Sequence, residues 1–556
     1  MLTNPRTRKR ALFASFGVFA LALATMIGTV VYQFGYSHEE LPPVPMHSDL
    51  TRQPMTTFAD SLNINTPEDI SQVPNSTCAP LASNWVAKEN AQPGISMTTK
   101  DWQQLDLQSA AGSALWLNKT SAGCGDEIKI HASLYGTRDT KFINGPRTIQ
   151  ALRIGWYQGS GAREVWNSGP ISLKNQKVIY PKNALRMVDT KWPTTATIKV
   201  GANWTPGFYL FVTRAMDGHI ENAAPLVIRS PLGSSKLLLV HSFLTWSAYN
   251  SFGGRSAYFG VGATKTEMRT DRSRVVSLDR PIVGSGGFAV HRDAISLVQF
   301  LEREGINVDQ ESDIDIDSWP SITKSYNGLV LGGHPEYFTR RIFDSFLAAR
   351  NSGINLAILG GNTAVWQTRL TASPVGENRR LIIYRNPKED PVQELSQVSI
   401  AFSDGRLNVP GTLITGTLTD GVHVYGDMKA TSIPSWLKIP SGSSITGISP
   451  DSEVEQAVKT VAEPPNVHIL FSGNMHYRDS ATVGSKRNIS PIAQSLWFTT
   501  PSGSAVFNAG ITTWSCDLIA TCAYSTVDEK SRTTLDSVTK QVLALWQTKG
   551  IGKTLK

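Results

Sequence analysis

The stretch that decides the fold is Asn327-Gly-Leu-Val-Leu-Gly-Gly333, which continues into His334-Pro-Glu-Tyr337. A short, continuous apolar run bounded by glycines is typical of a buried strand. A second strand with the same ending, Asn355-Leu-Ala-Ile-Leu-Gly-Gly361, follows it, and a stretch with helical spacing from Arg340 to Arg350 stands between the two. This strand–helix–strand alternation predicts a parallel, doubly wound sheet, in which ligands bind at the carboxyl ends of the strands.

The same alternation starts before this stretch and continues to the end of the chain. A buried strand is predicted at Leu237-Leu-Leu-Val-His241, and helices are predicted from Ala294 to Arg303 and from Thr533 to Trp546. Residues 371–505 show mostly strand patterns instead. We therefore expect an α/β fold for residues 231–556, with a doubly wound, mostly parallel sheet of the amidotransferase or flavodoxin type and a β-rich excursion at 371–505.

Residues 96–230 show a different pattern. Short runs of alternating or β-branched residues are separated by Gly and Pro, for example at Glu127–Tyr135, Ile149–Tyr157 and Gly207–Thr213. Strands of this length and spacing are typical of an antiparallel sandwich. We expect a β-sandwich domain here, ahead of the α/β domain.

The N-terminus carries a basic cluster followed by an apolar run. Four basic side chains lie between residues 6 and 10, and residues 11–34 carry no formal charge. Such a run is long enough to cross a bilayer core of about 30 Å, with the positive charges on the cytoplasmic side. We expect a cytoplasmic tail (1–10), a transmembrane helix (11–34) and an extended stalk (35–95), with the bulk of a single-pass plasma-membrane protein outside the cytoplasm. The alternative is a cleavable signal peptide, for which the apolar run is long.

All four cysteines follow the apolar run. Cys516 and Cys522 lie in one short stretch, whereas Cys78 and Cys124 lie near the start of the expected sandwich. Four cysteines allow three pairings, and this spacing favours Cys78–Cys124 with Cys516–Cys522. No pair has C-x-x-C spacing with a nearby histidine, so two disulfides in an oxidising compartment are favoured over a zinc site.

The composition and the charge distribution limit the class of protein. Of the 556 residues, 40% are hydrophobic and 18% are charged, which excludes a mostly disordered chain. The net charge of +8 comes from 53 basic and 45 acidic residues that are scattered along the sequence, without a long basic block after residue 10. We therefore expect no nucleic-acid partner.

The turn after the quoted strand carries groups that can move protons or ligate a metal. Paired glycines let the backbone turn sharply and approach a ligand closely. The turn places His334, Glu336 and Tyr337 at the carboxyl end of the strand, just before a helix. We predict a functional site here. The structural alternative is a tight turn that is capped by His334 and packed by Tyr337.

A second cluster lies between Thr245 and Tyr258, after the first strand of the α/β domain. Aromatic residues surround the amide of Asn250 and a pair of glycines in this loop. In a parallel sheet the loop opens at the same edge as His334, and an aromatic wall with a few polar groups is typical of a small-molecule pocket. A well-packed surface loop is the alternative. The predicted substrate-binding residues at this edge are Trp246, Tyr249, Gly253, Gly254, Tyr258 and Asn362.

The sequence lacks the motifs of several common enzyme classes. It contains no G-x-S-x-G elbow, no G-x-x-x-x-G-K-[ST] loop and no H-E-x-x-H motif. A Ser/His or Cys/His hydrolase mechanism therefore lacks its nucleophile.

The order of these pieces resembles the family of the N,N-dimethylformamidase large (beta) subunit. The resemblance extends from about residue 96 to 548 and includes the sandwich. It rests on Trp246-x-x-Tyr-Asn-x-x-Gly-Gly-Arg-Ser-x-Tyr258, Gly332-Gly-His-Pro-Glu-Tyr-Phe338, Leu359-Gly-Gly-Asn362 with Trp366, and Phe507-Asn-Ala-Gly510.

The resemblance implies a metal-dependent hydrolase of amide or related C–N bonds, with a mononuclear iron held by two tyrosines and a glutamate. It implies that Tyr337, the tyrosine of the Gly-His-Pro-Glu-Tyr motif, is a metal ligand. We therefore expect a membrane-anchored, extracytoplasmic enzyme that acts on a small molecule, with His334, Glu336 and Asn250 as catalytic residues. The alternative is a non-catalytic protein that keeps the fold to bind a cell-envelope ligand or to serve as a structural component.

Overall fold

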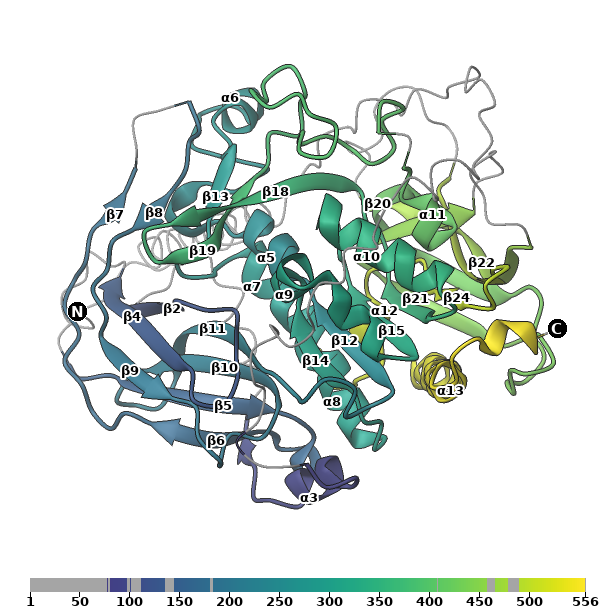
Figure 1. Cartoon of the computed structure of the whole chain (residues 1–556), viewed down its shortest axis with the longest axis horizontal. Coiled ribbons are helices and arrows are strands. Elements are labelled where there is room, and N and C mark those ends of the chain that lie inside the picture. Colours follow the sequence, from purple (N-terminus) through teal and green to yellow (C-terminus); the bar gives the residue numbers. More distant parts are fainter. Residues whose placement is uncertain are drawn as a thin grey trace, which may run out of the picture. The chain divides into compact units, whose positions relative to one another are not determined.

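The apolar run that ends at Gly333 forms strand β15 (Gly328–Gly333), which lies inside a nine-stranded sheet (Figure 1). Its neighbours β12 (Leu237–His241) and β17 (Asn355–Gly360) both run parallel to it. Every residue of the three strands is buried. Burial on both faces explains why their sequences are continuously apolar instead of alternating.

All described residues belong to one unit of the chain, residues 47–556. The computed structural model describes residues 78, 81–97, 101, 112–135, 145–180, 184–407, 409–457, 466–478 and 490–555.

The nine-stranded sheet has a parallel half and an antiparallel half. The parallel half consists, in sheet order, of β14 (Asp309–Ser312), β12, β15, β17 and β24 (Ala505–Asn508). The antiparallel half continues from β24 with β23 (Ile492–Thr499), β22 (His468–Tyr477), β20 (Thr417–Ala430) and β21 (Ser444–Ala457).

The prediction of a doubly wound, mostly parallel α/β fold is therefore wrong. The sheet is mixed, and the described residues form mainly β structure. The segment expected as an excursion at 371–505 supplies the antiparallel strands of the same sheet. Local sequence periodicity identifies strands but does not reveal which sheet edge they join, and this is the reason for the error.

Mostly short helices surround this sheet. The longest described helix is α13 (Glu529–Trp546). Its N-cap is Asp528, whose side chain accepts a hydrogen bond from the main-chain N–H of Ser531. The other α-helices are α3 (Trp85–Asn90), α5 (Phe243–Tyr249), α6 (Lys265–Thr270), α7 (Ser285–Ala289), α8 (Ser296–Arg303), α9 (Asp313–Ser318), α10 (Arg340–Asn351), α11 (Thr412–Thr415) and α12 (Trp514–Asp517). A π-helical segment (Val290–Ile295) joins α7 to α8, and short 3₁₀ segments lie at Tyr157–Gly159, Phe252–Gly254, Pro320–Ser325 and Ile551–Lys553.

The expected transmembrane helix, residues 11–34, lies outside the described residues. Among the helices that the structure does describe, none is both long enough and apolar enough to cross a membrane.

Two sheets ahead of the large sheet form the expected β-sandwich. They enclose a core of their own, to which both sheets contribute. The larger sheet contains, in order, β1 (Ile95–Ser96), β6 (Gly161–Asn167), β5 (Thr148–Ile154), β10 (Gly207–Arg214), β11 (Ile220–Ile228) and β3 (Ser121–Ala122). The smaller sheet contains β2 (Gly112–Leu117), β4 (Glu127–Tyr135) and β9 (Ala196–Lys199).

Strand β10 shows how the sandwich joins the rest of the fold. Phe208 and Leu210 belong to the large core shared with the nine-stranded sheet, whereas Tyr209 and Phe211 belong to the sandwich core. Because successive side chains of a strand point to opposite faces, one strand contributes to both cores. The larger sandwich sheet is therefore a middle layer that is covered on both faces.

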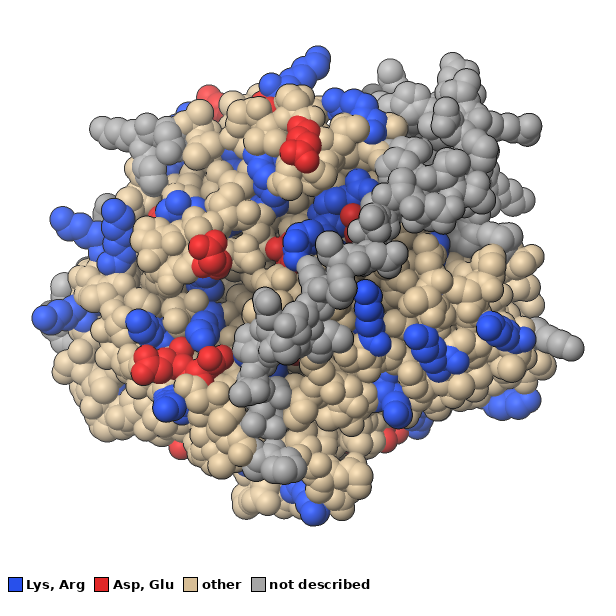
Figure 2. Space-filling view, in the orientation of Figure 1, with Lys and Arg blue, Asp and Glu red and all other residues tan. Residues whose placement is uncertain are grey.

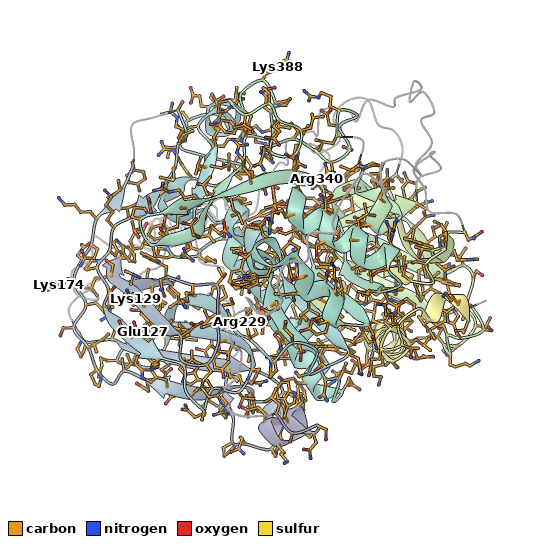
Figure 3. The ribbon with its side chains drawn as sticks, in the orientation of Figure 1. Glu127, Lys129, Lys174, Arg229, Arg340 and Lys388 are labelled. Atoms are coloured by element: carbon orange, nitrogen blue, oxygen red, sulfur yellow. A yellow bond between two sulfur atoms is a disulfide. The ribbon has the colours of Figure 1, made fainter. Side chains whose placement is uncertain are left out.

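Many charged side chains lie on the outside of this architecture (Figure 2). In β4 the exposed Glu127 and Lys129 alternate with buried isoleucines, and Figure 3 shows both on the sandwich, apart from Arg340 at the start of α10. On the face shown in Figure 2, Lys and Arg side chains are spread over the surface and interspersed with Asp and Glu. This agrees with the scattered charges of the sequence.

A further four-stranded sheet stands beside the carboxyl ends of the parallel strands. Its strands are, in order, β13 (Val275–Ser277), β19 (Gly376–Ile382), β18 (Trp366–Ser373) and β16 (Tyr337–Thr339). Strand β16 begins four residues after β15 ends, so the turn between them connects two sheets. A two-stranded ribbon, β7 (Val178–Ile179) with β8 (Asp189–Thr190), completes the described strands.

Candidate active site

The turn that follows β15 is possible only because two positions are glycine. Gly333 has φ +67°, and a Cβ atom there would lie 2.0 Å from the carboxyl carbon of Asp293. Gly360 pairs with Gly333 across the sheet, and a Cβ atom on Gly360 would lie 1.8 Å from the Gly333 carbonyl oxygen. The paired glycines therefore let β15 and β17 end in close contact and direct the next residues out of the sheet.

Glu336 lies at the centre of the cluster that follows. Its Oε2 accepts hydrogen bonds from the hydroxyls of Tyr249 (2.8 Å) and Tyr258 (2.6 Å). Its Oε1 accepts a hydrogen bond from Nε1 of Trp366 (3.0 Å). Glu336 is only 4% exposed, so this buried carboxylate is held by three donors, two from the segment 245–258 and one from β18.

Tyr337 lies behind Tyr258 as seen from Glu336. It is fully buried, and its hydroxyl donates a hydrogen bond to the Tyr258 hydroxyl (2.6 Å). The two hydroxyls and the carboxylate thus form a chain of hydrogen bonds in which Tyr337 donates to Tyr258 and Tyr258 donates to Glu336.

His334 connects this group to a second carboxylate. Its Nε2 lies 2.9 Å from the Tyr249 hydroxyl, 3.2 Å from Oε2 of Glu336 and 3.7 Å from Oε2 of Glu453. Burial lowers the pKa of His334, but the carboxylates of Glu453 and Glu336 outweigh burial and raise this pKa to about 9. The imidazole therefore holds a proton between two acidic side chains.

Asn362 holds the second carboxylate in place. Its Nδ2 donates to Oε2 of Glu453 (2.5 Å), and its Oδ1 accepts from the hydroxyl of Thr419. Asn362 follows β17 in the left-handed region, with φ +54°, a conformation that Asn tolerates better than most residues. Glu453 lies on β21, so the antiparallel half of the sheet supplies the second acid.

Glu455, two residues further on β21, is buried beside this group. It accepts hydrogen bonds from Nδ2 of Asn508 (2.9 Å) and from the main-chain N–H of Thr363 (3.1 Å). Burial raises its pKa despite these donors. Glu455 thus anchors the turn after β17, which carries Asn362.

The two phenols that contact Glu336 hold their protons tightly in the absence of a cation. Burial is the main cause that raises the pKa of both Tyr249 and Tyr258 well above the usual range, and the negative charge of Glu336 is the second cause. Opposite charge has the reverse effect, so a cation beside these oxygens favours their ionised forms.

Not all residues predicted for this edge join the cluster. The side chain of Asn250 donates to the Pro281 carbonyl (2.8 Å) and accepts from the main-chain N–H groups of Phe252 and Val283, so it holds its own loop together. Trp246 is buried in the core, 4.8 Å from the ring of Phe243.

The two glycines of the loop face elsewhere. A Cβ atom on Gly253 would meet Val188 at 2.5 Å, and one on Gly254 would meet Val261 at 3.5 Å. The structure thus brings together Tyr249, Tyr258, His334, Glu336, Tyr337 and Asn362 but does not bring Asn250, Trp246, Gly253 or Gly254 to them.

A buried arginine shapes the loop between the two tyrosines. Arg280 donates to the main-chain carbonyls of Asn250 (3.0 Å), Phe252 (2.9 Å) and Arg255 (3.0 Å). Burial lowers its pKa to about 10. Since these carbonyls lie between Tyr249 and Tyr258, Arg280 fixes the spacing of the two phenols.

The cluster fits a hard metal cation by the chemistry of its donors. Two phenol oxygens converge on one carboxylate oxygen, and oxygen donors of this kind suit hard cations and ferric iron. Within the described ranges, no group of three or more His, Cys, Asp or Glu side chains is arranged to hold a metal. The tyrosines therefore define this donor set.

Sequence reasoning missed Glu453, Thr419 and Arg385 at this site. Arg385, in the segment after β19, lies over the ring of Tyr258 with Cζ 4.3 Å from the ring centroid. These residues stand in stretches with ordinary strand or loop patterns, and their roles follow from strand pairing.

A comparison with protein families gives a match to this chain. A family model described as N,N-dimethylformamidase beta subunit-like, C-terminal, matches residues 148–526, more than half of the chain. The matched range includes every residue of the cluster described above. No curated protein matches the sequence. The resemblance drawn from the motifs is confirmed at the level of the family.

Proposed function

Because the chain belongs to the N,N-dimethylformamidase beta subunit-like family, we propose that it is a metal-dependent hydrolase of amide or related C–N bonds. The observation that carries the proposal is the convergence of the Tyr249 and Tyr258 hydroxyls on Oε2 of Glu336. These two tyrosines and one glutamate match the donor set that the resemblance implies for a mononuclear iron. Tyr258 thus takes the role that the motif alone gave to Tyr337.

The chemistry divides between the metal and the protein. When bound, the iron supplies Lewis acidity toward the amide carbonyl and lowers the pKa of a water molecule. Trp366 keeps Oε1 of Glu336 occupied, so that Oε2 faces the two phenols. This fixed orientation prepares the donor set before any ligand arrives.

Proton transfer is the role of His334 and Glu453. Nε2 of His334 faces Oε2 of Glu453 at 3.7 Å, within reach of a short rearrangement. Hydrolysis of an amide needs one group that takes a proton from water and one that gives a proton to the leaving amine. A buried imidazole next to a carboxylate provides both, and Asn362 holds that carboxylate at a fixed position.

The experiment measures metal content and hydrolysis together. Purified full-length chain is analysed for iron and assayed with N,N-dimethylformamide and a series of small formamides. We expect about one iron per chain and amine release, and we expect both to be lost in Tyr249→Phe and Tyr258→Phe. The matched control is Tyr326→Phe, a buried tyrosine on another edge of the fold, which should keep both.

A metal-free, folded protein without amide hydrolysis would contradict the proposal and favour the binding-protein alternative.

We further propose that the described part works in an oxidising compartment. Two disulfides, Cys78–Cys124 and Cys516–Cys522, support this, and they are the pairs that the spacing predicted.

A further inference from the structure

Each of the three proposed ligands, Glu336, Tyr249 and Tyr258, contacts a further side chain that helps to fix its position. Trp366 donates to Glu336, His334 contacts the Tyr249 hydroxyl, and Tyr337 donates to the Tyr258 hydroxyl. The third contact differs from the others because its donor is itself a buried phenol with a charged neighbour.

The direction of the hydrogen bonds at Tyr258 matters. Tyr337 donates to Tyr258 (2.6 Å), and Tyr258 in turn donates to Glu336 (2.6 Å). Tyr258 can therefore lose its own proton and still accept the hydrogen bond from Tyr337. Because Tyr337 is fully buried, solvent does not compete for its hydroxyl.

Arg385 completes this arrangement from the segment after β19. Its guanidinium carbon lies 4.3 Å from the ring centroid of Tyr258 and 5.3 Å from that of Trp366. Nη1 donates to the Tyr337 hydroxyl (3.5 Å), and Nη2 donates to the Ala257 carbonyl (2.9 Å). Arg385 therefore contacts the loop next to Tyr258, the ring of Tyr258 and the donor behind it.

The backbone at Arg385 indicates that the surrounding structure enforces this position. Its φ of +52° places a non-glycine residue in the left-handed region, a strained conformation that persists only where the surrounding structure holds it. The main-chain N–H of Arg385 donates to Oγ of Ser399 (3.2 Å), which helps to hold this conformation.

We propose that Tyr337 and Arg385 are positioning residues that withdraw electron density from the Tyr258 oxygen and so set its strength as a metal ligand. The inference rests on the proposed function, because it assigns Tyr258 to the metal. A hydrogen bond and a nearby positive charge both lower the energy of the phenolate lone pairs. A weaker donor leaves the metal more acidic toward a bound carbonyl.

The test uses a spectroscopic signature. The full-length chain is loaded with Fe(III), and the phenolate-to-iron charge-transfer band is recorded together with the iron affinity. In Tyr337→Phe the lone pairs of the Tyr258 phenolate rise in energy, so the charge-transfer band should move to longer wavelength. Arg385→Met should shift the band in the same direction. Arg385→Lys keeps the positive charge, so its band should lie between those of Arg385→Met and the wild type.

The controls separate this inference from the proposed function. Tyr326→Phe removes a phenol elsewhere and should leave the band unchanged. If Tyr337→Phe and Arg385→Met both bind iron with the wild-type band, this inference is overturned and the proposed function stands. A band that moves to shorter wavelength also overturns it. Wild-type protein that shows no such band with Fe(III) overturns both.

Discussion

Two buried carboxylates in this molecule, Glu336 and Asp517, have opposite surroundings. Glu336 accepts hydrogen bonds from two tyrosines and a tryptophan. Asp517 ends α12 and is fully buried, yet neither of its carboxylate oxygens has a hydrogen-bond partner of normal geometry among the described residues. Glu336 is thus arranged to bind a cation, whereas the charged form of Asp517 destabilises the fold.

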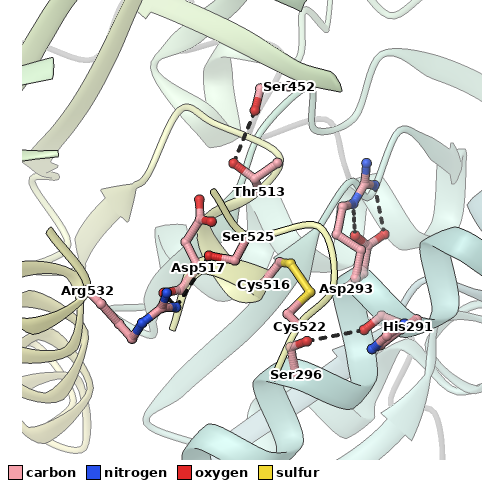
Figure 4. The surroundings of a disulfide bond; sticks show 11 residues. His291, Asp293, Ser296, Ser452, Thr513, Cys516, Asp517, Cys522, Ser525 and Arg532 are labelled. Atoms are coloured by element: carbon pink, nitrogen blue, oxygen red, sulfur yellow. Dashed lines mark hydrogen bonds and ion pairs between the residues drawn. A yellow bond between two sulfur atoms is a disulfide. The ribbon is translucent and has the colours of Figure 1, made fainter. Parts of the chain in front are cut away.

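The surroundings of Asp517 explain why its pKa is raised. Figure 4 shows it beside the Cys516–Cys522 disulfide, and Nη1 of Arg532 donates to the main-chain oxygen of Asp517 (2.8 Å) instead of to its carboxylate. Burial raises the pKa of Asp517 to about 7, against the opposing influence of the Ser525 and Thr513 hydroxyls and of Arg532. At Glu336, by contrast, the donors are phenols that can ionise in favour of a cation.

The largest expected effect is that of Glu336→Gln. Glutamine keeps the shape of the side chain but removes the charge on which both phenols converge, so iron should be lost. Without the metal, the activation free energy of amide hydrolysis should rise by about 4 kcal/mol or more, which lowers the rate at least about 1000-fold. Iron analysis and a rate assay check this. Asp517→Asn, which removes the other buried carboxylate, is the matched control and should retain its iron.

Next in size is the stability gain of Asp517→Asn. The raised pKa means that folded Asp517 binds its proton more tightly than the unfolded chain does, so wild-type stability falls as the pH rises from about 4 to about 7. The penalty reaches up to about 4 kcal/mol and stays constant above that range. Denaturant unfolding should therefore show a gain for Asp517→Asn at pH 8 that nearly vanishes at pH 4. An equal stability gain at pH 4 and pH 8 would show that ionisation of Asp517 does not destabilise the fold.

A smaller effect is expected from removing the disulfide beside Asp517. Cys516 and Cys522 are six residues apart, and a loop this short constrains the unfolded chain only modestly. The double variant Cys516→Ala/Cys522→Ala should lose about 2 kcal/mol in the free energy of unfolding. Its iron content should not change, because in the described part of the chain the two cysteines make no hydrogen bond to the Glu336 cluster. A loss of iron would show that the two regions are coupled.

The smallest effect concerns Trp366→Phe. This change removes one of the three donors to Glu336 and keeps an aromatic ring in place. Iron affinity should fall by about 10-fold, measured by competition with a chelator. Unchanged affinity would mean that the tyrosines alone orient the carboxylate.

Part of the site follows from the sequence because of one rule of parallel sheets. The carboxyl ends of neighbouring parallel strands meet at one edge, so His334, Glu336 and Asn362 are expected near the loop that carries Tyr249 and Tyr258. The structure brings all five together. Within that loop, however, the same pattern of aromatic and polar residues does not reveal which side chains turn toward the edge and which, like Asn250, close the loop itself.

The identity of the central tyrosines needed the fold. Tyr337 follows Glu336 directly in the motif, but adjacent residues in an extended segment point in different directions. Tyr258 comes from a loop almost eighty residues earlier and still donates to the same carboxylate oxygen. The family motif therefore pointed to Tyr337, whereas in the fold it is Tyr258 that donates to Glu336.

The sequence by itself determined the buried strands, the glycine-ended turns, the disulfide pairs and the family. The strands and turns depend on local periodicity and backbone conformation, the Cys516–Cys522 pair depends on short spacing and leaves Cys78 with Cys124, and the family is carried by motifs of a few residues each. Only the tertiary structure decided that residues after 371 extend the same sheet in antiparallel pairing, that Glu453 faces His334, and that Arg385 lies on Tyr258. The physical reason is that strand partners and buried contacts minimise the free energy of the whole chain, whereas the pattern of any one segment is compatible with several neighbours.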